Sequence, residues 1–169
     1  LLVSGLSARR VAGGTGLTAG QMMQSASFAG WDNAVWKFYD GHSAPLLKSF
    51  LAPLTVTIAS GSRVYDGTTA TSLGVSYSAT PNANLLGRGN LVVSAADKNV
   101  GEQALSASGL YSNQQGYDIS YVGGTLTISA KPISGTITAA DKAYDGTLVA
   151  TTSGRLSGVI AGDRVAFNT

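Results

Sequence analysis

The sequence predicts an all-β fold built from repeated modules, and three observations support this. The tetrapeptide Tyr65–Thr68 (Tyr-Asp-Gly-Thr) returns unchanged as Tyr144–Thr147, 79 positions later in the chain. Apolar residues alternate with Thr or Ser in residues 54–58 and 125–129, which is the period of a strand with one buried face. Only 12% of the 169 residues are charged and 22 are Gly. A repeat of this length corresponds to one small all-β domain.

The chain divides into three parts by composition and by the repeat. Residues 1–53 are rich in Gly and Ala and contain six of the 13 aromatic residues. Within them, Thr18 followed by good helix formers predicts a short helix over residues 19–25. Pro53 and Pro132 stand at the two starts of the repeat. We therefore expect a first repeat over residues 54–130 and the start of a second over 131–169, in a native chain that continues.

Short strands with frequent Gly, Asn, Asp and Ser turns predict sandwich-like repeat modules. The predicted strands cover residues 54–58, 74–78, 91–94, 117–122, 125–129, 136–139 and 159–167. The repeat also predicts that residues 54–71 superpose on residues 133–150, with Tyr65 and Tyr144 in the same environment. In both motifs Asp-Gly suits a tight turn, and the Tyr is expected to pack as a half-buried anchor.

The charge pattern argues against two kinds of partner. The formal net charge is +2, and the basic residues are scattered singly apart from Arg9-Arg10, so we expect no nucleic-acid partner. No apolar run approaches the length of a membrane-spanning helix, so we expect no membrane span. The chain has no Cys, which excludes disulfides and thiol nucleophiles.

The chain lacks the motifs of an active site, and we expect no enzyme activity, no cofactor and no metal. His42 is the only His, in a Gly-His-Ser-Ala-Pro turn without an evident partner. Four Asp residues are candidate calcium ligands by residue type, but no Asp-x-Asp-x-Asp-Gly loop occurs and Lys follows two of them. These four are Asp97, Asp118, Asp141 and Asp163.

Two stretches carry a resemblance to a known family. Residues 16–47 read GLTAGQMMQSASFAGWDNAVWKFYDGHSAPLL, with a Gly-Leu-Thr opening, a Gln-Met pair, Ser-x-x-Phe-x-Gly-Trp, a second Trp and a Gly-x-x-x-Pro-Leu-Leu exit. This resembles the segment that closes the β-helix in large bacterial exoproteins of the filamentous haemagglutinin type. RVYDGTTAT and KAYDGTLVAT resemble the YDG repeats of those proteins, and residues 109–129 resemble the strand pair that ends such a repeat.

The resemblance implies that residues 1–53 are the C-terminal end of a β-helix, closed by a short helix and an aromatic cap. The cap would consist of Phe28, Trp31, Trp36 and Phe38, whose rings cover the open core of the β-helix, and both Trp residues are expected to be largely buried.

The resemblance also implies a bacterial adhesin that is secreted or held at the cell surface, exported by two-partner secretion and active in aggregation or biofilm. Its outer-membrane secretion partner would contact regions outside this sequence. Extracellular polysaccharide or other copies of the adhesin would be its further partners.

Two other functions stay open. The first is a lectin-like module, in which a glycan stacks on Tyr65 beside Asp66 or contacts Asn113, Gln114 and Tyr117. The second is a polysaccharide-degrading enzyme on a β-helix, for which the nearby Asp32 and Asp40 are the local carboxylate pair.

Overall fold

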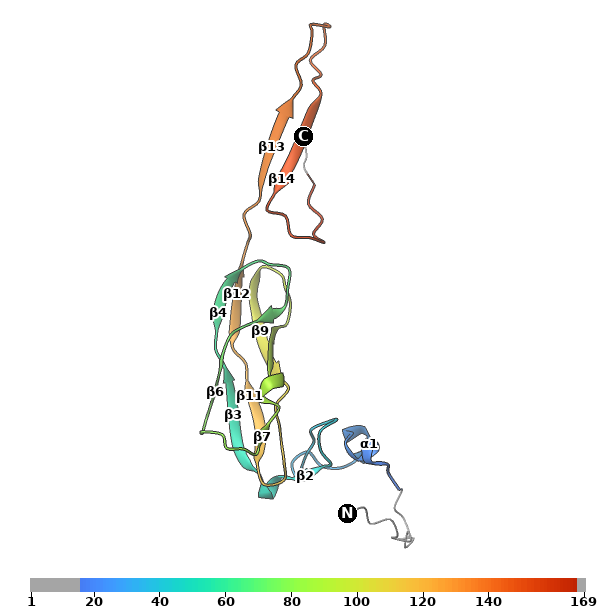
Figure 1. Ribbon diagram of the computed structural model, residues 1–169, viewed down its shortest axis with the longest axis vertical. Coiled ribbons are helices and arrows are strands. Elements are labelled where there is room, and N and C mark those ends of the chain that lie inside the picture. Colours follow the sequence, from blue (N-terminus) through green and yellow to red (C-terminus); the bar gives the residue numbers. More distant parts are fainter. Residues whose placement is uncertain (1–15, 167–169) are drawn as a thin grey trace. The chain divides into compact units, whose positions relative to one another are not determined.

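The computed structural model describes residues 16–166, and its elements are mostly strands, in agreement with the predicted all-β class (Figure 1). The N-terminal part contains the helix α1 (Ala19–Met22) and the 3-10 turns η1 (Ser25–Phe28) and η2 (Lys48–Phe50). Two short strands, β1 (Trp36–Lys37) and β2 (Leu46–Leu47), pair antiparallel between these turns. The remaining elements are β3 (Ala52–Ile58), β4 (Gly61–Val64), β5 (Ala70–Thr71), β6 (Val75–Tyr77), β7 (Leu85–Leu86), η3 (Arg88–Asn90), β8 (Val92–Ala95), β9 (Gly101–Ser108), β10 (Tyr111–Ser112), β11 (Tyr117–Val122), β12 (Thr125–Ser129), β13 (Ser134–Ala139) and β14 (Thr152–Ser157).

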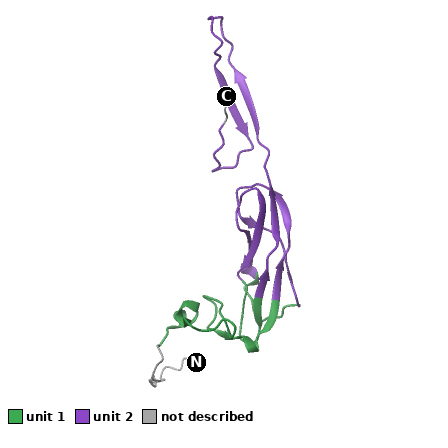
Figure 2. Ribbon diagram, turned by 180° about the vertical axis from the view of Figure 1, so that it is seen from behind, with its two compact units in different colours: residues 1–54, 80–88, 110–119 green, residues 55–79, 89–109, 120–169 purple. Residues whose placement is uncertain are grey.

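The chain forms two compact units, each of which is discontinuous in sequence (Figure 2). Unit 1 comprises residues 1–54, 80–88 and 110–119, and unit 2 comprises residues 55–79, 89–109 and 120–169. Strands β3 and β11 each begin in unit 1 and end in unit 2. The division therefore cuts across the predicted 54–130 module.

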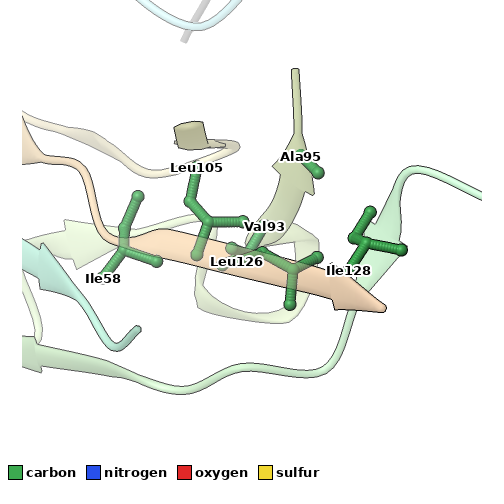
Figure 3. Close-up of a cluster of buried hydrophobic side chains, with 6 residues drawn as sticks. All are labelled: Ile58, Val93, Ala95, Leu105, Leu126 and Ile128. Carbon is green, nitrogen blue, oxygen red and sulfur yellow. The ribbon is translucent and has the colours of Figure 1, made fainter. Parts of the chain in front are cut away.

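Unit 2 contains a five-stranded sheet in the order β4-β12-β9-β8-β5. Strand β12 lies parallel to β4 on one side and antiparallel to β9 on the other. The predicted alternation in β12 is confirmed, since Leu126 and Ile128 are buried while their Thr and Ser neighbours are exposed. Their side chains meet others from β3, β8 and β9 in one apolar core (Figure 3). The core residues are Ile58, Val93, Ala95, Leu105, Leu126 and Ile128.

The strand pairing of the first repeat recurs in the second with the same register. In the first repeat β3 pairs antiparallel with β6, and Val56 lies opposite Tyr77. In the second repeat β13 pairs antiparallel with β14, and Gly135 lies opposite Leu156. Each residue of the second pair lies 79 positions after its counterpart, so the spacing seen in sequence also holds in the strand pairing.

The N-terminal part matches one prediction and leaves another open. Thr18 caps α1 in a capping box, because its hydroxyl accepts from the Gln21 amide at 3.2 Å and the Gln21 side chain accepts from the Thr18 amide at 2.9 Å. Residues 16–53 contain only this short helix, 3-10 turns and short strands, without a β-helical coil of their own. The predicted end of a β-helix stays a prediction, since residues 1–15 lie outside the described part.

The prediction of a strand over residues 159–167 is wrong, since residues 159–166 form no strand. The chain leaves β14 at Ser157, and Gly158 and Gly162 follow with φ of 91° and 94°, which no extended strand adopts. The Asp163 amide closes a turn onto the Ile160 carbonyl at 3.1 Å. Phe167 lies outside the described residues.

The sequence pattern did not predict β9 or β14, the two longest strands outside the predicted ranges. Strand β9, Gly101–Ser108, joins β8 to β12 in the middle of the sheet, and Leu105 is its one fully buried side chain. Its Gly, Glu, Gln, Ala and Ser residues gave no alternating apolar signal. Among residues 16–166, no helix is long and apolar enough to cross a membrane.

The repeat offers a matched pair of substitutions for the core. Ile58 is 2% exposed, while its counterpart Ile137 is 55% exposed. We expect Ile58→Ala to lower the free energy of unfolding by about 2–5 kcal/mol, since it leaves a cavity among packed side chains. Ile137→Ala should change it by less than about 0.5 kcal/mol. Urea unfolding followed by circular dichroism measures both, and equal losses would contradict the assigned core.

Candidate functional site

The Tyr-Asp-Gly-Thr motif forms the same turn in both repeats. The Asp66 carboxylate accepts from the amide and hydroxyl of Thr68 at 2.9 and 3.0 Å. The Asp145 carboxylate accepts from the amide and hydroxyl of Thr147, each at 2.9 Å. Gly follows each Asp with φ of 78° or 75°, a conformation that other residues rarely adopt. The motif therefore specifies a turn held by the Asp side chain.

A basic side chain clamps each turn from two positions before the Tyr. Arg63 pairs with Asp66 at 3.2 Å and donates to the carbonyl oxygens of Thr68 and Ala70. In the second repeat, Lys142 occupies the place of Arg63.

The Lys142 ammonium pairs with Asp145 at 2.7 Å and donates to the carbonyls of Thr147 at 3.2 Å and Val149 at 2.6 Å. These partners lie 79 positions after those of Arg63. The upstream basic residue therefore belongs to the turn.

The hydrogen bonds and ion pairs of the two turns lower the pKa of the Asp66 and Asp145 carboxyl groups, with a different main cause in each. For Asp66 the largest cause is the hydrogen bond from the Thr68 amide, while the Arg63 charge contributes less. For Asp145 the largest cause is the hydrogen bond from Lys142, followed by that from the Thr147 amide. Each motif thus favours the ionised Asp.

The two Tyr residues of the motif differ in environment. Tyr65 packs against the core of unit 2, and its hydroxyl donates to the Asp163 carboxylate at 2.9 Å. That hydrogen bond is the main cause that raises the pKa of Tyr65. Tyr144 is 98% exposed, so the predicted half-buried anchor is confirmed for Tyr65 and wrong for Tyr144. Within residues 16–166 the second repeat has no counterparts of the strands β8, β9 and β12, which supply the core beside Tyr65.

A cleft of about 280 Å³ lies beside Tyr65, where residues of the two repeats meet within unit 2. From the first repeat it is lined by Tyr65 and Val100, and from the second by Lys131, Ile160 and Asp163, among others. Two polar side chains of this lining, Tyr65 and Asp163, are hydrogen-bonded to each other.

The other predicted glycan contacts are engaged within unit 1. Gln114 accepts from the Leu47 amide and donates to the Leu47 carbonyl, both at 3.1 Å. Asn113 donates to the Asn84 side chain at 3.0 Å. Tyr117 is buried, and its hydroxyl accepts from the Asn82 amide at 3.0 Å. Since Tyr65 and Asp66 belong to unit 2, neither unit by itself gathers all five predicted contacts.

The predicted aromatic cap assembles as a cluster of rings in unit 1. The ring centroid of Phe28 lies 4.8 Å from Trp31 and 6.0 Å from Phe38, and Trp31 lies 4.4 Å from Trp36. Trp36 is partly buried, but Trp31 is 43% exposed, so the prediction that both are largely buried is wrong. The rings contact one another, and no described residue covers the outer side of Trp31 enough to bury it.

Tyr39 is a structural residue that sequence analysis missed. Its buried hydroxyl donates to the Tyr117 carbonyl at 2.7 Å and accepts from the Ile119 amide at 3.1 Å. It thereby bonds the N-terminal part to β11 within unit 1. An aromatic residue next to Phe38 gave no signal that its hydroxyl reaches a strand so far along the chain.

Asp118, weighed above as a calcium ligand, pairs instead with two Lys side chains. Lys37 lies 2.8 Å and Lys48 3.5 Å from its carboxylate oxygens. Desolvation by burial is the largest single influence and raises the pKa of Asp118, but the hydrogen bonds and charges of Lys37 and Lys48 together lower it below its ordinary value. No group of three His, Cys, Asp or Glu residues able to hold a metal occurs within residues 16–166.

The residues considered for catalysis have local structural contacts. Asp40 accepts from the amide and hydroxyl of Ser25, both at 2.8 Å, and Asp32 accepts from the Ala34 amide at 2.7 Å. The His42 ring is exposed and stacks on Tyr111, with centroids 4.0 Å apart and an interplanar angle of 7°.

No family model matches this chain, and neither a curated protein nor a solved structure is significantly similar to it.

The clamps predict unequal responses to loss of the basic residue. Lys142→Gln should raise the pKa of Asp145 toward its ordinary value, because Lys142 is the main cause of the lowering. Arg63→Gln should leave the pKa of Asp66 still lowered, because the Thr68 amide remains. Carboxyl NMR shifts recorded between about pH 2 and pH 6 measure both values.

The sign of the pH dependence follows from the direction of these shifts. A lowered pKa in the folded state stabilises the fold above the ordinary Asp pKa, and this contribution is lost as the pH falls through the lowered value. Equal rises in the pKa of Asp66 and Asp145 in the two variants would contradict the assigned causes.

Tyr39→Phe should lower the free energy of unfolding by about 1–3 kcal/mol, because the buried Ile119 amide and Tyr117 carbonyl lose a shared partner. Tyr144→Phe, at a 98% exposed position, is the control and should change it by less than about 0.5 kcal/mol. Urea unfolding measures the difference, and similar values for the two variants would refute the role given to Tyr39.

Proposed function

We propose that this chain is a scaffold segment of an extracellular bacterial adhesin or biofilm-matrix protein that is secreted or held at the cell surface. The observation that carries the proposal is the recurrence, 79 residues apart, of one strand pairing register and one Asp-Gly turn clamped by a basic residue. Modules that repeat in series, each contacting its neighbours, provide length and separation between binding partners.

The resemblance of residues 16–47 and of the two YDG motifs to filamentous haemagglutinin-type exoproteins supports the same proposal. On this proposal, residues 1–53 close a β-helix and the repeats continue from it as a stalk. Export then follows the two-partner route, with a secretion partner that contacts regions outside this sequence. The segment itself catalyses nothing, and its action on cells is mechanical.

A scaffold is favoured over a lectin-like module by the contacts of the residues that were considered for glycan binding. The Gln114 side chain makes two hydrogen bonds with the backbone of Leu47, one as acceptor and one as donor. Tyr117 is buried, and the Tyr65 hydroxyl is hydrogen-bonded to Asp163. A glycan that used these groups would have to displace those contacts. Polysaccharide or other copies of the adhesin remain the proposed partners through other surfaces.

In-frame deletion of the Tyr-Asp-Gly repeats should weaken cohesion between cells in the producing bacterium while export continues, because the stalk is shortened. His42→Ala is the control and should leave cohesion unchanged. Aggregation assays with immunodetection of the protein at the cell surface measure both. Loss of cohesion in a folded and exported His42→Ala variant would overturn the scaffold proposal.

Glycan binding tests the lectin-like alternative separately. The 169-residue chain should show no binding on a glycan array that depends on Tyr65 or Gln114. Specific binding that Gln114→Ala or Tyr65→Phe abolishes, in variants with unchanged circular dichroism, would favour the lectin-like module over the scaffold.

A further inference from the structure

We infer that the Tyr-Asp-Gly motif of each repeat is the surface on which a turn of the following repeat packs. In the second repeat this turn is residues 158–163, which end in Gly162-Asp163. In the first repeat this surface is occupied by residues 158–163 of the second. The exposed motif at Tyr144 is then a docking surface for the equivalent turn of a further repeat. The inference depends on the repeat organisation and not on where the protein acts, so it can fail independently of the adhesin proposal.

The first contact of this joint is polar. The Tyr65 hydroxyl donates to the Asp163 carboxylate at 2.9 Å, a charge-assisted hydrogen bond between residues 98 positions apart. Asp163 is held in place by a turn, because its amide donates to the Ile160 carbonyl at 3.1 Å. Gly158 and Gly162, with positive φ, bend the chain on either side of Ile160. The second repeat therefore presents its carboxylate from a formed turn.

The second contact of the joint is steric and apolar. A Cβ atom added to Gly67 would lie 2.9 Å from the Ile160 side chain, so Ile160 packs directly over the glycine of the motif. At the counterpart, Gly146, the same added atom would meet nothing within 4 Å. The occupied and the exposed motif thus differ at the glycine as well as at the Tyr.

The apolar surface around Tyr144 fits such an occupant. Leu148 and Val149 are exposed beside Tyr144 and its clamped turn. The turn itself has the same hydrogen bonds as the occupied one. The two motifs have the same structure, so the Tyr144 motif should bind the same kind of turn as the Tyr65 motif does. That turn has an apolar residue three positions before an Asp, as Ile160 stands before Asp163.

The first experiment uses the 169-residue chain. Tyr65→Phe and Asp163→Ala should each raise hydrogen exchange in residues 158–165 by roughly tenfold, since the first removes the donor and the second the acceptor of the same hydrogen bond. The double variant should exchange no faster than either single variant. Tyr144→Phe is the matched control and should leave exchange unchanged. Unchanged exchange in Tyr65→Phe, or an equal rise in Tyr144→Phe, would overturn the joint.

The second experiment tests the surface at Tyr144 with a lengthened chain, residues 1–165 followed directly by residues 93–169. The junction is chosen because Gly162-Asp163-Arg164-Val165 aligns with Gly89-Asn90-Leu91-Val92, which ends in the first residue of β8, once six extra residues in the first repeat after Tyr77 reduce the offset from 79 to 73 (162 − 89). The added residues complete the second repeat and supply a third, so the lengthened chain contains Tyr144 twice. The copy in the third repeat is changed to Phe, and only the Tyr144 of the second repeat can then be labelled at this position. Hydroxyl-radical labelling of Tyr144 should be several-fold slower than in the 169-residue chain.

Asp163→Ala in the third repeat alone should restore fast labelling of Tyr144, because it removes the acceptor of the Tyr hydroxyl. An unchanged labelling rate in the lengthened chain would overturn the proposal, and so would failure of the added residues to fold, because the proposal requires interchangeable repeats. Protection of Tyr144 that appears in the 169-residue chain on raising its concentration would show a second copy as the occupant and would also overturn it.

Discussion

The parallel pairing of β4 with β12 is the constraint on which the first repeat depends. Parallel neighbours cannot be joined by a tight hairpin, so the whole chain between Val64 and Thr125 serves as their connection. Strand β12 also pairs with β9, and it buries Leu126 and Ile128 in the core of unit 2. The ladder is continued at the motif itself, because the Tyr65 amide donates to the Ser129 carbonyl at 2.9 Å. The position of the Tyr-Asp-Gly turn is thus set by the last strand of its own repeat.

Much of the strand content could be predicted from sequence because burial on one face leaves a pattern of period two. Leu54, Val56 and Ile58 show this pattern, and all three are buried in β3. Strand β9 also buries one face, but the positions on that face are Gln103, Leu105 and Ala107, and a single large apolar residue gives no pattern in the sequence. Residues 159–166 have an apolar pattern, but the chain bends at Gly158, just before them, and at Gly162, both with positive φ. The backbone conformation of a glycine cannot be predicted from the pattern of apolar residues around it.

The candidate site could be predicted only in its local part. The Asp-Gly turn follows from adjacent residues, and the repeat pointed to the upstream basic residue without giving its role. The carbonyl group of Ala70, to which Arg63 donates, and the hydrogen bond between Tyr65 and Asp163 could not be predicted, because both depend on how the chain folds in space. The burial of Tyr65 likewise needs core strands that have no counterpart within the second part of the chain, so an identical tetrapeptide does not imply an identical environment.

The direction of β4 and β12 has a mechanical consequence. The two strands lie side by side and run the same way, with β4 near the start of the repeat and β12 at its end. Tension applied at the N-terminal side of β4 and the C-terminal side of β12 pulls the strands past each other. All hydrogen bonds of their ladder are then loaded together in shear, instead of opening one after another as when a hairpin is unzipped. A module connected in this way resists force through its ladder as a whole, whatever the strength of each single bond.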